Sequence, residues 1–578
     1  MNGALRFWPY LKPHGRRLAW AVLAMCVVAL INGGSVLLLK PIVDRIFIAR
    51  DLAMLWLAVA GVPLLIAGKT VASYVQNYLM SWIGQTVAQG IREDLFRRLM
   101  ELPIDFHDHR HSGEILSRVT SDLTMVQAAL VSVPLYLIRD SMTLAALTGS
   151  LFYLDWRFAL IALAGAPLTA TAFLILSRKM RRSSLQCQTM LERLTERFEE
   201  SLRGIFAIQS LNYEAGAIEK FQAENDSFFS LMMRYLRATA LAAPLMELCG
   251  ALVAAALIFF GGTAVIEARM TPGAFFAFLG AFLSAIAPIK NLARTNSDLQ
   301  RALASGERIF ELLDHEPRRA RGRQFAGLRQ DLRLDRVCFL HPGATRQALV
   351  DISFLLGRGG SLAVVGPAGA GKTTLMRLLL LLNEPTSGRI LFDGTDSRDL
   401  DPSSLRGRVG IISEKTKIFN ETLWGNIALG RKDVSQEQMD RACRAAGLGE
   451  WIAAQPEGPY ARLDHGGAAL GAGLRKRIAL ARVALKSPDL LLLDEATAGL
   501  DAEGQAEFLT LLAPLLKDRA VVCAGHRLQA ALGLTRVLML ADGRIADCGD
   551  HESLLARNPF YQRLYCGPAA AEAIDPVP

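Results

Sequence analysis

Paired cysteines are missing from this sequence. Its eight cysteines stand singly, and no CxxC pair occurs. Disulfide frameworks and structural zinc sites need paired, closely spaced cysteines, so this scatter argues against both and indicates reduced thiols. The first apolar run is long and is not followed by an evident small-residue cleavage site, so we expect no cleavable signal peptide.

Charge is scarce over long stretches of the first 300 residues and becomes common after about Pro317. The chain has 578 residues, which is too long for one ordinary domain, and 51% of them are apolar. The formal net charge is +9. In a membrane protein such an excess sits in cytoplasmic loops, so nucleic acid is not a predicted partner.

Six apolar segments are predicted to cross a bilayer as helices, because each is long enough for ~30 Å of hydrocarbon. The predicted spans are Leu18–Leu39, Leu52–Trp82, Met125–Leu154, Trp156–Leu176, Ala240–Ile266 and Pro272–Leu292. Basic residues cluster after the second and fourth spans, which predicts cytoplasmic chain ends and cytoplasmic basic loops. Asn2–Lys12 mixes aromatic and basic residues and predicts a short interfacial helix.

Two long charged stretches, Gly84–Thr124 and Arg178–Ala238, are predicted to extend the helices beyond the membrane. Their turns are predicted near His111–Ser121 and Asn212–Phe221, where they could contact another domain. The alternative is that both stretches are ordinary solvated loops.

Cations inside the spans are candidates for substrate binding, because burying charge in a membrane is costly. Lys69, Arg139 and Lys290 come from three different spans. At ~1.5 Å per residue, all three lie roughly 22–27 Å below the outer surface. The shared level predicts a ring that faces an anionic group. The alternative is internal pairing, for example of Arg139 with Glu247 or Asp140, or snorkelling to the cytoplasmic surface.

A glycine-rich loop predicts a nucleotide site in the second half. An apolar strand at Ser361–Val365 comes before the loop and a helix at Leu375–Leu382 follows it, which is the P-loop order. Lys372 supplies a point charge for the β- and γ-phosphates, and the hydroxyl of Thr373 can coordinate Mg²⁺. The residues predicted to bind nucleotide in this loop are Gly366, Gly369, Gly371, Lys372, Thr373 and Thr374.

Further residues are predicted to complete this site. An apolar strand ends in two carboxylates, of which Asp494 is assigned to Mg²⁺ and Glu495 to general-base activation of water. A second apolar strand ends at His526, which could reach the γ-phosphate, although a lone histidine is often structural. Asp501 follows in a turn, and His341 lies upstream where an aromatic ring could stack on adenine.

The stretch Leu470-Gly-Ala-Gly-Leu474 opens a predicted basic helix just before the strand with the two carboxylates. With six spans, a linker and these nucleotide motifs in order, the whole chain resembles ABC exporter half-transporters. The resemblance implies two nucleotides between two chains, with Gly471 and Gly473 of one chain facing the γ-phosphate of the other. Leu37–Asp44, Pro288–Asn296 and the three cations are similar to MsbA-type lipid flippases, whose matching positions contact the charged lipid A headgroup.

The sequence departs from the family pattern at several positions. Gly471 stands where the family signature Leu-Ser-Gly-Gly-Gln has serine, and losing that hydrogen bond to phosphate costs on the order of 1.5–3 kcal/mol. Glu414 replaces the Q-loop glutamine but can still act as a Mg²⁺ ligand. His341 replaces the adenine-stacking tyrosine, and His465 replaces an acidic residue upstream of the signature.

These departures leave two interpretations of the assembly open. In heterodimers of the family, one subunit often keeps the catalytic glutamate but has a degraded signature, and its partner shows the reverse. This chain, with intact Glu495 and His526, fits the first role. The alternative is a homodimer with two slow sites.

The predicted fold is an all-α membrane domain of six helices followed by a cytosolic α/β P-loop NTPase domain. The predicted boundaries are 1–316 for the transmembrane domain, 317–330 for the linker, 331–567 for the nucleotide-binding domain and 568–578 for a disordered tail.

The predicted function is ATP-driven export or flipping of an amphipathic, anionic lipid across the bacterial inner membrane by a dimer that uses ATP and Mg²⁺. The predicted partners are a second half-transporter and the membrane lipid. One alternative is a multidrug or peptide exporter. Another is a nucleotide-gated regulatory or channel-like subunit with little transport, which the degraded signature motivates.

Overall fold

The computed structural model describes residues 5–110, 112–316, 322–463, 467, 470–525, 534 and 536–566. His465, His526 and the predicted tail 568–578 lie outside these residues. The chain divides into two compact units. The helical unit comprises Met1–Arg97 and Ile115–Asp314, and the nucleotide unit comprises Arg98–Glu114 and His315–Pro578.

Long helices form the helical unit, as the apolar runs predict. Its helices are α2 (Trp8–Leu11), α3 (Gly15–Leu37), α4 (Leu39–Pro41), α5 (Leu52–Glu101), α7 (Ser112–Ser117), α8 (Leu123–Pro134), α9 (Ser141–Leu154), α10 (Trp156–Arg203), α11 (Ile205–Ser210), α12 (Glu214–Ile266) and α13 (Pro272–Asp314). However, the end of α5 and the start of α7 belong to the nucleotide unit. Wider π-helical turns join some of them, at η2 (Ile42–Ile48), η3 (Arg118–Asp122) and η4 (Leu135–Asp140). The predicted spans overlap α3, α5, α8 with α9, α10, α12 and α13.

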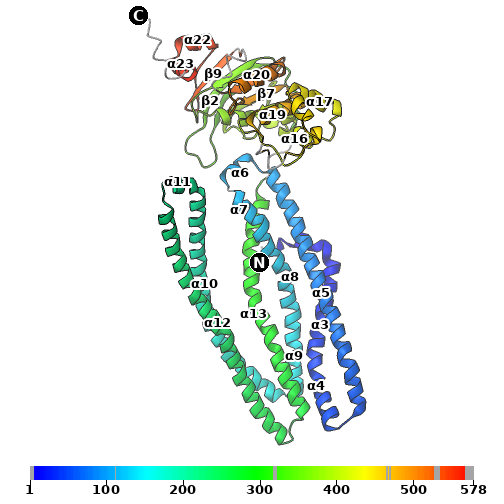
Figure 1. Ribbon diagram of the computed structural model, residues 1–578. Helices are drawn as coiled ribbons and strands as arrows, with labels where there is room; N and C mark the ends of the chain where they lie inside the picture. The colour runs from blue at the N-terminus through cyan, green and yellow to red at the C-terminus, as the bar shows by residue number, and fades with distance from the viewer. Residues whose placement is uncertain are drawn as a thin grey trace. The chain divides into compact units, whose positions relative to one another are not determined.

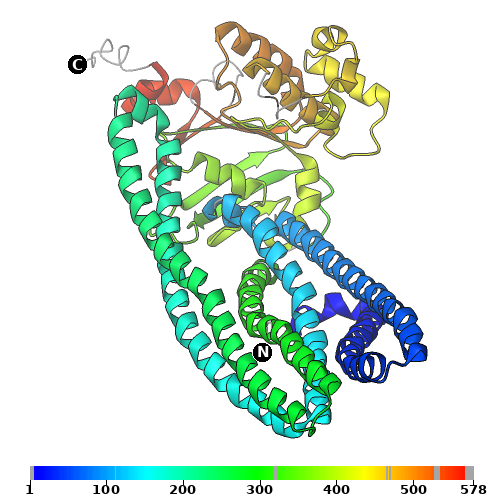
Figure 2. The same cartoon turned by 60° about the horizontal axis from the view of Figure 1, so that its bottom comes forward.

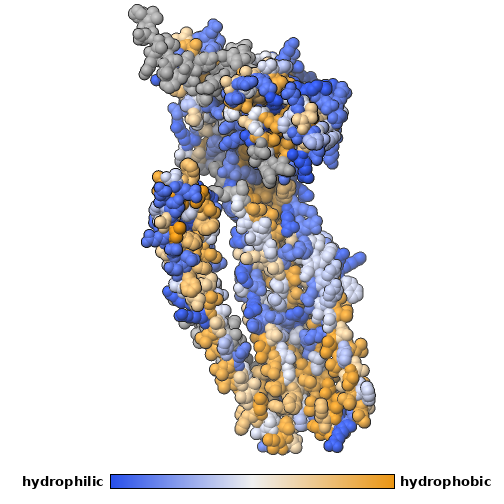
Figure 3. All heavy atoms as spheres, in the orientation of Figure 1, coloured by the Kyte–Doolittle hydropathy of each residue, from blue (hydrophilic) through white to orange (hydrophobic). Residues whose placement is uncertain are grey.

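Several of these helices are suited to a membrane. Among the described residues, four stretches are long and apolar enough to cross one, and these are Trp8–Ile48, Leu52–Glu101, Gly113–Leu154 and Pro272–Asp314. Large apolar side chains such as Trp56 and Leu64 are more than 70% exposed. Figure 3 shows apolar residues gathered at the α4 and α9 end of this unit and hydrophilic residues toward its other end. Exposed apolar surface on this scale indicates a lipid environment.

The helices pack in a bundle with one long pair. α3 packs on α9, α13 packs on α8 and α9, and α10 runs alongside α12 (Figures 1 and 2). A Cβ atom at Gly33 would lie 2.5 Å from the Cβ of Ala146, so α3 and α9 approach closely there. Within the segment predicted as an interfacial helix, Trp8–Leu11 forms α2, and Tyr10 of α2 donates a 2.8 Å hydrogen bond to Asp94 of α5.

The nucleotide unit contains an antiparallel sheet and a mostly parallel sheet. The first has the order β2-β1-β4-β5, formed by β1 (Asp331–Phe339), β2 (Leu349–Gly357), β4 (Ser387–Phe392) and β5 (Thr395–Asp396). The second has the order β10-β9-β3-β8-β7-β6, formed by β3 (Ser361–Val365), β6 (Val409–Ile412), β7 (Leu490–Asp494), β8 (Ala520–Ala524), β9 (Arg536–Ala541) and β10 (Arg544–Gly549). In this sheet β10 is antiparallel to β9, and the other pairs are parallel.

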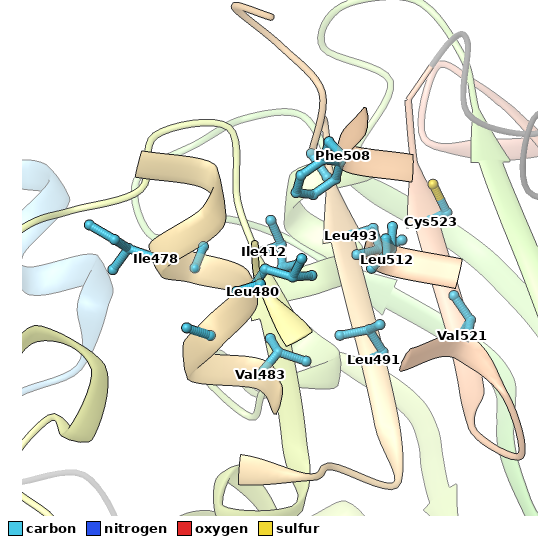
Figure 4. Packing of buried hydrophobic residues seen from close by; sticks show 14 of the residues in the cluster. Ile412, Ile478, Leu480, Val483, Leu491, Leu493, Phe508, Leu512, Val521 and Cys523 are labelled. Atoms are coloured by element: carbon cyan, nitrogen blue, oxygen red, sulfur yellow. The ribbon is translucent and has the colours of Figure 1, made fainter. Parts of the chain in front are cut away.

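The nucleotide unit contains further helices, of which some pack directly on the mostly parallel sheet and others pack on those helices. They are α14 (Lys372–Leu379), α15 (Pro402–Arg408), α16 (Leu423–Ala428), α17 (Gln436–Ala445), α18 (Gly449–Ala453), α19 (Ala472–Lys486), α20 (Ala502–Leu516), α22 (His551–Arg557) and α23 (Pro559–Cys566). In the core, Leu480 of α19 and Phe508 of α20 pack against Leu493 of β7 (Figure 4). This packing fixes the strand that ends in Asp494.

The short helix α6 (Ile104–His109) belongs to the nucleotide unit. Pro103 separates it from α5, because its ψ of 152° is extended and a proline disfavours the helical conformation of the residue before it. Asp105 accepts a 2.6 Å hydrogen bond from Asn383, and Asp108 accepts one of 2.5 Å from Arg377 of α14. The first turn that the sequence predicts to be intracellular therefore lies earlier than predicted, at α6, and the chain is helical again from Ser112.

The second turn that the sequence predicts to be intracellular also lies slightly earlier than predicted. It consists of α11 and the turn at Leu211–Asn212, and α12 begins at Glu214. Phe206 in α11 and Leu211 are exposed by 83% and 76%.

Candidate functional site

The carboxyl ends of four neighbouring strands meet at one edge of the parallel sheet. β3 leads into the glycine-rich loop, and β7 leads into Glu495. β6 lies two residues before Glu414, and β8 lies two residues before His526. Parallel strands place their carboxyl ends on the same side, so the separate sequence motifs converge here. His526 itself lies outside the described residues.

Glycine is required at the ends of the phosphate-binding loop. Gly366 and Gly371 have φ angles of 157° and 100°, which disfavour any side chain. A Cβ at Gly366 would lie 2.2 Å from the carbonyl oxygen of Leu540, and one at Gly371 would lie 2.6 Å from that of Ala348. Gly369 also has a positive φ, of 79°. The loop can therefore turn its backbone N–H groups toward an anion.

Lys372 begins α14 and is 7% exposed. Its Nζ donates hydrogen bonds to the carbonyl oxygens of Gly366 and Pro367, at 2.8 and 2.9 Å. Burial lowers the pKa of Lys372, while the nearby carboxylates of Glu495 and Asp494 oppose that shift. The lysine and the two carboxylates therefore share one site, as the sequence predicts.

Asp494 and Glu495 lie together at the end of β7. Burial and the charge of Glu495 raise the pKa of Asp494, although a hydrogen bond from the Thr373 hydroxyl opposes this. Glu495 has a φ of 48°, an uncommon left-handed conformation for a non-glycine residue, and such strain clusters at functional sites. A partly buried pair of carboxylates beside a hydroxyl is a donor set that suits a hard cation.

The signature stretch forms the start of α19. Gly471 is its N-cap, without a side-chain cap, and Gly473 lies in the first turn. A Cβ at either glycine would meet nothing within 4 Å. In contrast, Asp501 is the N-cap of α20, where it accepts a 3.0 Å hydrogen bond from the N–H of Gly504. That contact gives Asp501 a structural role, and its contact with nucleotide stays a prediction.

His341 lies beside the loop, on the chain that follows β1. Its Nε2 is 3.3 Å from the hydroxyl of Thr374, and its Nδ1 is 4.0 Å from a carboxylate oxygen of Asp105 in α6. The ring is also 4.8 Å from that of Phe339, edge to face. The predicted adenine-stacking residue thus also connects α14 with α6.

The predicted substrate cations lie in the helical unit. Arg139 Nε donates a 2.7 Å hydrogen bond to Asp140, which is 3% exposed and also accepts a 2.8 Å bond from Asn291. The alternative pairing of Arg139 with Asp140 is therefore present. Lys290 precedes Asn291 and is exposed, and Lys69 of α5 is half-buried.

The sequence interpretation missed Lys476, which is 3% exposed in α19. Its Nζ donates 2.9 Å hydrogen bonds to the carbonyl oxygens of Ser413 and Glu414. The available signal was its spacing, because Lys476 lies four and seven residues before the buried Leu480 and Val483 and so shares their face of α19.

A chain that combines membrane helices with a phosphate-binding site at the edge of a parallel sheet belongs to the class of nucleotide-driven transporters. Family models match on both parts, the ABC transporter transmembrane region at residues 19–289 and the ABC transporter model at residues 349–498. The chain belongs to the ABC transporter family. It is an ATPase coupled to transport across a membrane, and it uses ATP.

Named relatives match over nearly the full length. The ATP-dependent lipid A-core flippase of Syntrophus aciditrophicus (strain SB) is 33% identical over 558 residues, 96% of this chain and 92% of the relative. The protein of the same name from Desulfotalea psychrophila is 32% identical, over 97% of this chain and 98% of the relative. A bacterial Atm1-family ABC exporter with ATP bound has the same fold, with a TM-score of 0.78, 24% identity and coverage of 98% and 99%.

Proposed function

We propose that this chain is half of a dimeric exporter that moves an amphipathic, anionic lipid, such as a lipid A or a phospholipid, across the bacterial inner membrane. Full-length similarity to proteins named as lipid A-core flippases is the observation that carries the proposal. The nucleotide unit and both chain ends are then cytoplasmic, as the basic loops favour.

The three intramembrane cations are the proposed headgroup contacts. Asp140 accepts hydrogen bonds from Arg139 and from Asn291, the neighbour of Lys290, which supports a shared level for these two cations. Asp140 neutralises only one of the three positive charges of Lys69, Arg139 and Lys290. The surplus positive charge favours a phosphorylated headgroup over a neutral one.

At the nucleotide site, Lys372 and the loop N–H groups hold the phosphates, and His341 faces the base. Thr373, Asp494 and Glu414 are the proposed ligands of Mg²⁺, which would neutralise phosphate charge when bound. Glu495 then accepts a proton from the attacking water, and His526 is proposed to contact the γ-phosphate. Gly471, Gly473 and Asp501 are proposed to contribute to the site from the opposing chain, with the helix dipole of α19 favouring negative charge.

The substrate proposal is tested by replacing Lys69, Arg139 and Lys290 together with glutamine. Glutamine keeps a hydrogen-bond donor for Asp140 while removing the charge. We expect stimulation of ATPase activity in nanodiscs by a phosphoglycolipid to fall by roughly tenfold or more, with stimulation by a neutral drug unchanged.

Lys40→Gln provides the control, because Lys40 is exposed beyond the end of α3. Equal loss for both ligands would contradict an anionic headgroup site. Stimulation by the neutral drug alone would favour a multidrug exporter.

A further inference from the structure

A buried lysine joins two parts of the nucleotide site that are distant in sequence. Lys476 lies in the second turn of α19, the helix that opens with Gly471. Its ammonium group donates to the carbonyl oxygens of Ser413 and Glu414, both at 2.9 Å, just after β6. With a side chain 3% exposed, the ammonium exchanges most of its water for these two carbonyl groups.

The charges of three carboxylates act on this ammonium group, and the like charge of Arg475 opposes them. Burial lowers the pKa of Lys476, and the charges of Glu414, Asp494 and Glu495 oppose that shift. Two of these carboxylates, Asp494 and Glu495, also act on Lys372. The carboxylates at the sheet edge thus have a lysine from the phosphate-binding loop and a lysine from α19 as counter-charges.

Glu414 explains why a second lysine is useful at this position. The sequence has a carboxylate at 414 where the family has a neutral glutamine, so this site carries one more negative charge near the triphosphate. That charge repels nucleotide unless a cation offsets it. Among the described residues, Lys476 is the buried cation whose ammonium group donates a hydrogen bond to the backbone carbonyl of Glu414 itself.

The geometry points to Lys476 as a positioning residue that ties the 413–414 segment to α19 and supplies the charge that lets a glutamate stand at 414. The inference rests on the proposed role of Glu414 at the nucleotide site. It follows that α19 and Glu414 move together, so the placement of Glu414 depends on the helix that presents the signature glycines.

A double-mutant cycle tests this pairing. The variants are Lys476→Gln, Glu414→Gln and the two combined, in the full chain in nanodiscs. Affinity for a fluorescent ATP analogue is measured with and without Mg²⁺, together with kcat and KM for ATP hydrolysis. Lys432→Gln is the charge control, because Lys432 is exposed beyond α16.

Lys476→Gln is expected to weaken Mg²⁺-free nucleotide binding by roughly tenfold, because one positive charge near the triphosphate is lost. The combined variant is expected to recover most of that loss, since the net charge is restored and the new amide can donate to one carbonyl group. Lys476→Arg keeps the charge and is expected to retain affinity better than Lys476→Gln. A combined variant no better than Lys476→Gln would overturn the inference, as would native-like binding by Lys476→Gln.

Thermal unfolding of each variant identifies any folding defect. If Lys476→Gln does not fold, the inference is tested with Glu414→Gln alone. In that variant the charge of Lys476 is no longer offset by Glu414, so nucleotide should bind more tightly without Mg²⁺. Unchanged binding would refute the inference. Retention of ATP by the native chain tests the nucleotide site separately, so a failure of the proposed function is distinguishable from a failure of this pairing.

Discussion

At the scale of single residues, the backbone conformation of Glu495 holds its carboxylate in place for its proposed role in catalysis. Its φ of 48° directs the chain out of β7 immediately after Asp494, and its N–H donates a 2.9 Å hydrogen bond to the carbonyl of Ala524 in β8. A strained residue tied to a neighbouring strand is held in one position. A fixed carboxylate of this kind suits a general base.

Glu495→Gln should therefore keep nucleotide binding and remove turnover. Glutamine has the same shape but cannot accept the proton, and general-base catalysis typically contributes about 10²–10⁴-fold. The measurement is kcat for ATP hydrolysis together with ATP retained after desalting. Glu503→Gln, on the exposed first turn of α20, is the control, and undiminished hydrolysis in Glu495→Gln would exclude this role.

Some contacts of the nucleotide site can be predicted from the sequence, and others cannot. The convergence of Lys372 and Asp494 follows from strand order, because apolar runs that end in polar motifs predict parallel strands with a shared edge. The contacts of Lys476 do not follow from its own segment. They depend on how α19 packs against the end of β6, which only tertiary structure determines.

At the scale of elements, α6 is the segment of the nucleotide unit that continues directly from the membrane helix α5. Sequence reasoning predicted that an intracellular turn would contact another domain, but it placed the turn too late because it did not use Pro103 as the end of the helix. The acidic residues Asp105 and Asp108 hold α6 through Asn383 and Arg377, which flank the carboxyl end of α14.

Replacing Asp105 and Asp108 together with asparagine should uncouple transport from hydrolysis. Two hydrogen bonds, worth about 1 kcal/mol each, would be weakened, so α6 docks less often by roughly 5- to 30-fold. We expect basal ATPase activity to change less than stimulation by substrate, both measured in nanodiscs. Asp433→Asn removes a comparable surface carboxylate as the control, and substrate stimulation equal to that of the native chain would show that α6 does not transmit the signal.

At the scale of the whole molecule, the effect of the altered signature at Gly471 depends on the identity of the second chain. In a homodimer, each Glu495 faces a signature that lacks the serine hydroxyl. In a heterodimer, the Glu495 site would be completed by the signature of a different chain, and Gly471 would face the site of that partner. Purification with a tag on one copy would show whether an untagged copy or a different half-transporter accompanies it.

The rate of ATP hydrolysis by the Gly471→Ser variant distinguishes a homodimer from a heterodimer. The φ of Gly471 is −60° and no atom lies within 4 Å of an added Cβ, so serine fits without strain and can cap α19. In the purified chain alone, we expect kcat for ATP hydrolysis to rise roughly ten- to a hundredfold, because a hydroxyl hydrogen bond to phosphate is regained. Gly449→Ser, at the equally open start of α18, should leave the rate unchanged. A rate that stays low in Gly471→Ser would indicate that catalysis at Glu495 requires the signature of another chain.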